Sequence, residues 1–100
     1  MKNDPIYVIT MMRSKDYFEK FRERVVGFYH EKENAENHLL KNYGDIYENE
    51  YDLAVIEETY PGLFSINDTR WFYKYVPDTE KYFPIGEPEE FKQVINLGIG

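Results

Sequence analysis

The sequence predicts an α+β fold, a mostly antiparallel sheet of four to six strands with one main amphipathic helix, at about residues 31–43, on one face. Several short stretches rich in β-branched and aromatic residues are separated by turn residues, as is typical of strands. Only one stretch carries the longer apolar period of an amphipathic helix. A chain of 100 residues has room for one hydrophobic core, so residues 1–100 are predicted to form a single domain.

Two strands are predicted in the first third of the chain. Residues 6–11 are apolar on both alternating faces, which predicts a strand in the interior of the sheet. A second strand is predicted at 24–30, where Gly27 indicates a bulge or the close approach of another element. Between them, residues 14–21 fit a short helix and a structured loop equally well.

The helix is predicted from periodicity and from its end signals. Ala35, Leu39 and Tyr43 recur every fourth residue and so share one face. Acidic residues lie in the first turn, a lysine lies in the last, and Gly44 suits the left-handed position after a helix. The face turned away from the sheet is expected to be polar and to carry Lys32, Glu36 and Asn37.

The second half of the chain predicts three more strands. Residues 51–59 and 69–76 have strand composition, and a Tyr-Pro-Gly turn at 60–62 follows the first of them. A turn at 77–80 leads to 81–85, whose proline restricts that strand to an edge of the sheet. The remaining short elements are an extended piece at 46–48, one or two helical turns at 88–92 and a short strand at 94–99.

Composition and charge exclude several classes of function. The chain has no cysteine, which excludes disulfides and cysteine-ligated metals, and its formal charge of −7 opposes direct binding to nucleic acid or anionic lipid. The first quarter is slightly basic, but acids interleave its basic residues, so we interpret it as a solvated, salt-bridged segment. Neither a membrane-spanning run nor a signal peptide is found, and the expected location is cytoplasmic.

The apolar content raises a packing problem. The strands predicted at 6–11, 25–29 and 53–56 are apolar on both faces, whereas one helix covers about one face. The second face must be covered by the loop at 60–68, the aromatic hairpin and the C-terminus, or by another chain. The last alternative is slightly favoured, which predicts a homodimer or a heterologous protein partner.

The aromatic content supplies the candidate binding residues. Trp71, Tyr73 and Tyr75 alternate along one predicted strand and share one face. Turned outward they form a binding surface, and turned inward, the favoured orientation, they fill the core. Arg70 and Glu57 complete the set of candidate binding residues.

Neither a metal site nor a catalytic site is predicted. Two histidines, His30 and His38, are eight residues apart and would be displaced by about 80° around a helix, so they do not form a ligand pair. Adjacent glutamates at 57 and 58 point to opposite faces of a strand, so one of them is expected to form a cross-strand ion pair with Arg70 or Lys74. There is no nucleophile elbow and no phosphate-binding loop. Enzymatic activity is therefore unsupported, and no cofactor is expected.

One segment resembles a loose group of small uncharacterised prokaryotic and phage-type proteins. These share a strand and helix unit of the form V-x-G-x-Y/F-x-x-x-E-x-A, which the chain matches from Val25 to Ala35. The resemblance also includes residues 6–10, Ala54 to Glu58, and Trp71-Phe72. It implies an α+β fold and assigns no site residues.

Three functions follow as hypotheses. The first is a non-enzymatic interaction module that acts as a homodimer or subunit. The second is an acidic mimic of nucleic acid that inhibits a basic protein, based on the charge of −7 and on the acids at 31–36, 45–52, 57–58 and 87–90. Charge reversal at Glu87, Glu89 and Glu90 is expected to abolish its binding. The third is a small-molecule-binding domain or enzyme with a pocket between the helix and the 60–68 loop, containing Arg70, Glu57 and His30.

Overall fold

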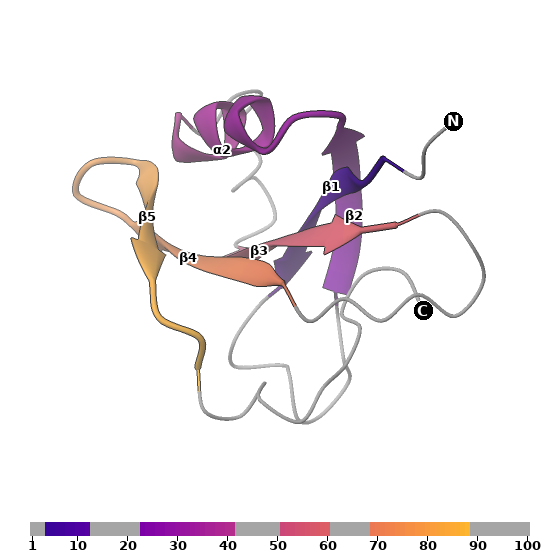
Figure 1. Cartoon of the computed structure of the whole chain (residues 1–100). Coiled ribbons are helices and arrows are strands. Elements are labelled where there is room, and N and C mark those ends of the chain that lie inside the picture. Colours follow the sequence, from indigo (N-terminus) through magenta and orange to yellow (C-terminus); the bar gives the residue numbers. More distant parts are fainter. Residues whose placement is uncertain (1–3, 13–22, 42–50, 61–68, 89–100) are drawn as a thin grey trace.

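The computed structural model confirms the α+β fold, with one antiparallel sheet of five strands and one helix. The structure describes residues 4–12, 23–41, 51–60 and 69–88. The elements in chain order are β1 (Ile6–Met12), β2 (Glu23–Tyr29), α2 (Lys32–Leu40), β3 (Leu53–Thr59), β4 (Arg70–Val76) and β5 (Lys81–Ile85). Figure 1 shows α2 on one side of the twisted sheet. The elements expected at 14–21, 46–48, 60–68, 88–92 and 94–99 lie wholly or mostly outside the described residues.

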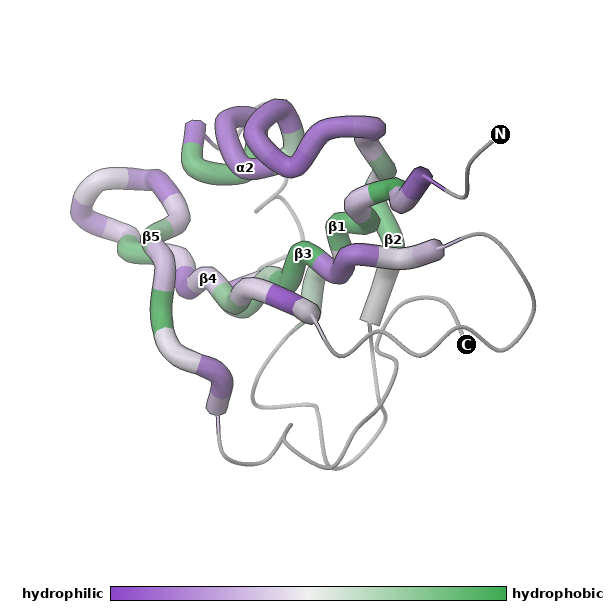
Figure 2. Tube along the Cα trace, viewed as in Figure 1, coloured by the Kyte–Doolittle hydropathy of each residue, from purple (hydrophilic) through white to green (hydrophobic). Residues whose placement is uncertain are grey.

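The strand order in the sheet is β2-β1-β3-β4-β5, and every neighbouring pair is antiparallel. The apolar strands β1 and β3 lie in the interior of the sheet (Figure 2), which the sequence predicted for the strand at 6–11. The proline-containing strand β5 lies at one edge, and β2 lies at the other. Among the strands that the structure describes, β2 and β5 are therefore the two edges of the sheet.

Gly27 lies beside a bulge in β2. The pairing with β1 shifts register between Ile9 and Thr10, so that Val26 has no partner there. A Cβ atom built on Gly27 would meet nothing within 4 Å. Of the two alternatives that Gly27 indicated, the bulge is the one observed.

Helix α2 ends earlier than periodicity indicated. It covers nine residues, from Lys32 to Leu40, and Lys41 leaves the helical conformation with φ −88° and ψ 2°. Ala35 and Leu39 are fully buried against the sheet, as predicted. Because so short a helix is marginal in isolation, its contact with the sheet must stabilise it.

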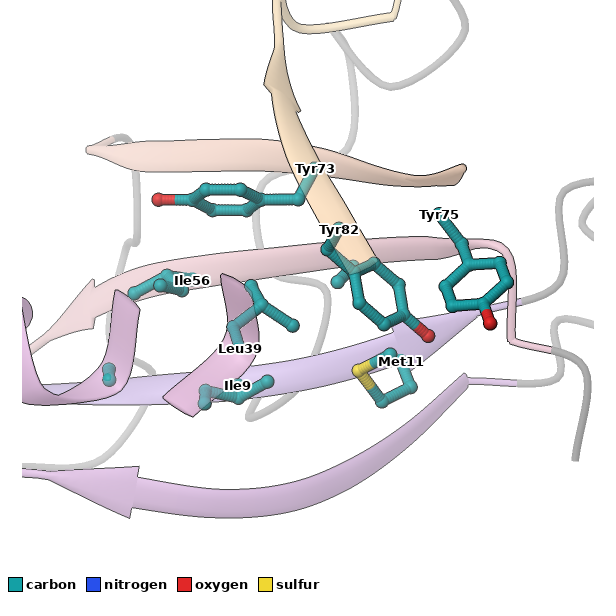
Figure 3. Close-up of a cluster of buried hydrophobic side chains, with 9 residues drawn as sticks. Ile9, Met11, Leu39, Ile56, Tyr73, Tyr75 and Tyr82 are labelled. Carbon is teal, nitrogen blue, oxygen red and sulfur yellow. The ribbon is translucent and has the colours of Figure 1, made fainter. Parts of the chain in front are cut away.

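The core has two parts, one on each face of the sheet. On the helix side, Leu39 packs over side chains that alternate along the strands (Figure 3). These strand residues are Ile9, Met11, Ala54, Ile56, Tyr73, Tyr75 and Tyr82. The second face holds a smaller buried cluster of Met12, Leu53, Val55 and Phe72. Within the single chain the centre of this second face is already buried, so a second chain is not needed to cover it.

Candidate binding surface at the N-terminal end of the helix

The aromatic stripe of β4 faces the helix. Tyr73 and Tyr75 are only 1% and 9% exposed, and their rings lie in the core beside Leu39 and Met11 (Figure 3). The inward orientation favoured by the sequence is the observed one, and these two rings offer no surface to a partner. Trp71, at the other end of the stripe, is only partly buried.

The other two candidate residues lie on the opposite face. Alternate residues of a strand point to opposite sides of the sheet, so Arg70 points away from the helix that Trp71 faces. Glu57 lies opposite Arg70 in the ladder between β3 and β4 and is fully buried. The guanidinium of Arg70 donates a hydrogen bond of 2.9 Å to Glu87 Oε2. Arg70 and Glu57 thus lie on the face of the sheet opposite the helix, and the 60–68 loop expected to line the predicted pocket lies mostly outside the described residues.

This geometry also limits the acidic surface expected for a nucleic-acid mimic. Glu57 is buried, and Glu87 is already paired with Arg70. Glu89 and Glu90 lie outside the described residues. Glu57 and Glu87 therefore present no unpaired charge to a basic protein, whereas Glu31 and Glu33, at the start of the helix, are exposed.

A chain of polar contacts connects the first turns of α2 to β4. The Lys32 ammonium lies 4.7 Å from the centroid of the Trp71 ring and donates a hydrogen bond of 3.1 Å to Glu36 Oε1. The Tyr73 hydroxyl donates a hydrogen bond of 2.8 Å to Glu36 Oε2. Lys32 and Glu36, expected to point away from the sheet, therefore contact its aromatic residues, whereas Asn37 is exposed as expected.

These contacts change the pKa values of both partners. Burial alone would raise the pKa of Glu36, but the hydrogen bonds from Tyr73 and Lys32 outweigh it and lower that pKa below its usual value of 4.5. Burial, and then the hydrogen bond to Glu36, raise the pKa of Tyr73 far above its usual value. The pair is therefore held with Glu36 ionised and Tyr73 protonated.

The Glu36–Tyr73 pair makes a testable contribution to stability. A lowered carboxyl pKa stabilises the fold above the unfolded pKa, and this contribution is lost as the pH falls through the folded value. The raised pKa of the Tyr73 phenol stabilises the fold at pH values below the unfolded pKa of tyrosine. This contribution to stability is lost only in strong alkali. We expect Tyr73→Phe to lower the free energy of unfolding by about 1–2 kcal/mol at neutral pH. In urea denaturation the difference from the wild type should shrink as the pH falls below about 4.

Tyr82→Phe is the matched control for this measurement. Tyr82 is as buried as Tyr73, but its hydroxyl donates a hydrogen bond of 2.6 Å to the backbone carbonyl of Tyr51, which does not titrate. Tyr82→Phe should therefore lower the free energy of unfolding by the same amount at acidic and at neutral pH. If the two variants follow the same pH profile, the charge of Glu36 does not stabilise the fold.

A second group of polar aromatic residues lies beside Trp71. The Tyr7 ring is 6.4 Å from the Trp71 ring, and Tyr7 lies opposite Glu58 in the pairing of β1 with β3. The Tyr60 hydroxyl donates a hydrogen bond of 2.9 Å to Glu58 Oε2. Partial burial and then the charge of Glu58 raise the pKa of Tyr7, and the hydrogen bond to Glu58 raises that of Tyr60. The surface around Trp71 is thus aromatic and acidic.

This surface continues into a shallow, open hollow of about 430 Å³, lined by Tyr7, His30, Glu31, Lys32 and Glu33. We call it the N-terminal hollow, because its last three residues begin helix α2. The other histidine is placed differently, since His38 Nδ1 lies 2.7 Å from the Tyr29 hydroxyl. In the described part of the chain, no group of three or more His, Asp or Glu residues could hold a metal ion.

Comparison with known proteins assigns no family to the chain. Neither a protein family, nor a curated protein, nor a solved structure matches it. Within residues 4–12, 23–41, 51–60 and 69–88, no helix is long and apolar enough to cross a membrane. The resemblance of residues 25–35 to small prokaryotic and phage-type proteins stays a prediction, and function must be argued from the chain's own surface.

Proposed function

We propose that the protein is a non-enzymatic interaction module that associates with a second copy of itself through the edge strand β2. The observation that carries this proposal is the concentration of exposed apolar side chains on that strand. Val25, Val26 and Phe28 are 42%, 38% and 58% exposed, and they fall within four consecutive positions. Apolar residues gathered in one place on a surface are typical of interaction sites.

An edge strand offers backbone donors and acceptors as well as apolar side chains. β1 pairs with one side of β2, and no described strand pairs with the other. A second strand added there would use the free N–H and C=O groups and continue the sheet. In this position the exposed valines and Phe28 would be covered at the same time.

The sequence of β2 suits pairing with itself. Two antiparallel copies related by a two-fold axis at Val26 would place Val26 opposite its own copy and Val25 opposite Gly27. The bulge at Val26 increases the local twist, so the paired segment is expected to be short and the association weak and reversible.

Sedimentation of the purified protein over micromolar to millimolar concentrations tests this proposal. The mass should rise with concentration from 12.1 kDa toward twice that value. Each chain carries a formal charge of −7, so the copies repel each other and added salt should strengthen the association. Phe28→Lys places a charge in the proposed interface and should keep the protein monomeric.

Phe83→Lys is the matched control, because Phe83 is 43% exposed and lies on β5 at the opposite edge of the sheet. This variant should associate as the wild type does. A wild-type protein that stays monomeric at every concentration would overturn the proposal. Equal loss of association in the two lysine variants would show that self-association does not depend on β2.

A further inference from the structure

We propose that the N-terminal hollow binds a primary ammonium group, such as that of a diamine, a polyamine or a lysine side chain. Aromatic rings together with carboxylates are the combination that recognises organic cations in proteins. The hollow supplies both, because Tyr7, Glu31 and Glu33 are among its lining residues. Self-association through β2 is not required for this binding.

The protein already binds one ammonium group beside the hollow, and that group is its own. The ammonium of Lys32 lies over the Trp71 ring at 4.7 Å and on Glu36 at 3.1 Å. An aromatic face and a carboxylate are thus sufficient to hold a cation on this part of the surface. The hollow repeats the arrangement with Tyr7, whose ring lies 6.4 Å from that of Trp71.

The charge balance of the hollow favours a cation over an anion. Glu31 and Glu33 are exposed and have no ion-pair partner within the described residues, whereas the charge of Lys32 is compensated by Glu36. The N-terminus of a helix contributes the equivalent of only about half a positive charge. Two carboxylates outweigh it, so an anion such as phosphate would be repelled.

The size of the hollow favours a flexible ligand with a small charged head. Its volume of about 430 Å³ lies at the lower end of the range for small-molecule sites. An alkylammonium chain can place its charge between the carboxylates and its methylene groups against Tyr7. Because the hollow is open to solvent, the expected affinity is modest.

The single tryptophan is a built-in reporter for the test, because Trp71 lies next to Tyr7. The full-length protein would be titrated with cadaverine, with a short lysine-containing peptide and with the uncharged diol of the same length as cadaverine. Trp71 fluorescence and the amide resonances of Tyr7, His30 and Glu33 would be followed. We expect saturable changes with both ammonium ligands and none with the diol.

A pair of glutamate variants tests the role of the carboxylates. Glu33→Gln removes one charge from the hollow, and we expect it to weaken cadaverine binding by about twofold to fivefold. Glu80→Gln makes the same chemical change in the turn between β4 and β5 and should leave binding unchanged. The amide spectrum outside the hollow shows that both variants are folded.

The outcomes separate the sources of the ammonium group and can overturn the proposal. Tighter binding of the peptide would indicate a lysine of a partner protein, and tighter binding of cadaverine would indicate a free polyamine. The proposed site would be overturned by any of three results. These are no saturable change with either ammonium ligand, an equal response to the diol, and equal weakening of cadaverine binding by the two glutamine variants. A stronger response to inorganic phosphate would overturn its assignment to cations.

Discussion

Replacing Phe72 with alanine is expected to lower the free energy of unfolding by about 3–5 kcal/mol. The Phe72 side chain is 2% exposed and packs with Met12, Leu53 and Val55 on the face of the sheet opposite α2. Its truncation removes buried apolar area and leaves a cavity that neighbouring side chains fill only in part. Because small domains are stabilised by only about 5–15 kcal/mol, urea denaturation should show a large fall in the midpoint.

Phe83→Ala is the control for this prediction, because it makes the same change on the neighbouring strand. Phe83 pairs with Lys74 and so shares a face with Phe72, but it is 43% exposed. We expect Phe83→Ala to lower the free energy of unfolding by less than about 1 kcal/mol. If the two variants lost equal stability, Phe72 would not belong to a core. If the loss at Phe72 depended on protein concentration, a second chain would be covering this face.

Phe72 lies on the face of the sheet for which the sequence slightly favoured cover by another chain. Strands that are apolar on both faces led to the expectation that another chain covers the second face. The burial of Val8, Val55 and Phe72 within one chain shows that the centre of the sheet needs no such cover. The argument for a partner therefore moves from the centre of the sheet to its edge, where Phe28 is 58% exposed.

The strands could be predicted from the sequence because their signals are local. A run of residues that is apolar on both faces placed the strand at 6–11 within one residue of β1 (Ile6–Met12). The turn at 77–80 is closed by a hydrogen bond from Glu80 N–H to the Val76 carbonyl, as its composition indicated. A strand's period and its turns depend on the residues themselves and not on distant parts of the chain.

The candidate site could not be predicted, because its contacts join segments that are far apart in sequence. On its own helix, Lys32 shows only a neighbour four residues away, Glu36. Its position over Trp71 depends on how α2 lies across the sheet and on β4 following β3 in the strand order. The sequence signal that could have indicated the contact is a pair of opposite charges on the helix together with a strand rich in aromatic residues. That signal does not specify which ring receives the cation.

Burial of the aromatic stripe on β4 also depends on how distant segments of the chain pack together. Trp71, Tyr73 and Tyr75 share a face by alternation, which the sequence established, but the side on which α2 lies decides whether that face is core. The burial differs along the stripe, because Tyr73 and Tyr75 lie in the core with Leu39 (Figure 3), whereas Trp71 is only partly buried. One stripe therefore supplies core residues at one end and part of the candidate binding surface at the other.

Leu39→Ala is the second substitution expected to have a large effect. It should lower the free energy of unfolding by about 2–5 kcal/mol. Leu39 is the one large side chain of α2 that is fully buried, and it packs over Ile9, Met11 and Tyr82 in the core on the helix side. A helix of nine residues depends on such contacts for its stability. The amides of α2 should therefore lose protection from hydrogen exchange before those of the central strands β1 and β3.

Leu40→Ala is the matched control, because Leu40 is adjacent to Leu39 but only partly buried. Leu40→Ala should lower the free energy of unfolding by about 1 kcal/mol and leave the protection of the α2 amides from hydrogen exchange nearly unchanged. Equal losses in the two variants would contradict the assignment of Leu39 as the side chain that attaches the helix to the sheet. Because Lys32 and Glu33 are carried by this helix, a loosened α2 should also weaken the binding of cadaverine in the N-terminal hollow. A Leu39→Ala protein that binds cadaverine as the wild type does would show that the hollow forms without a firmly attached helix.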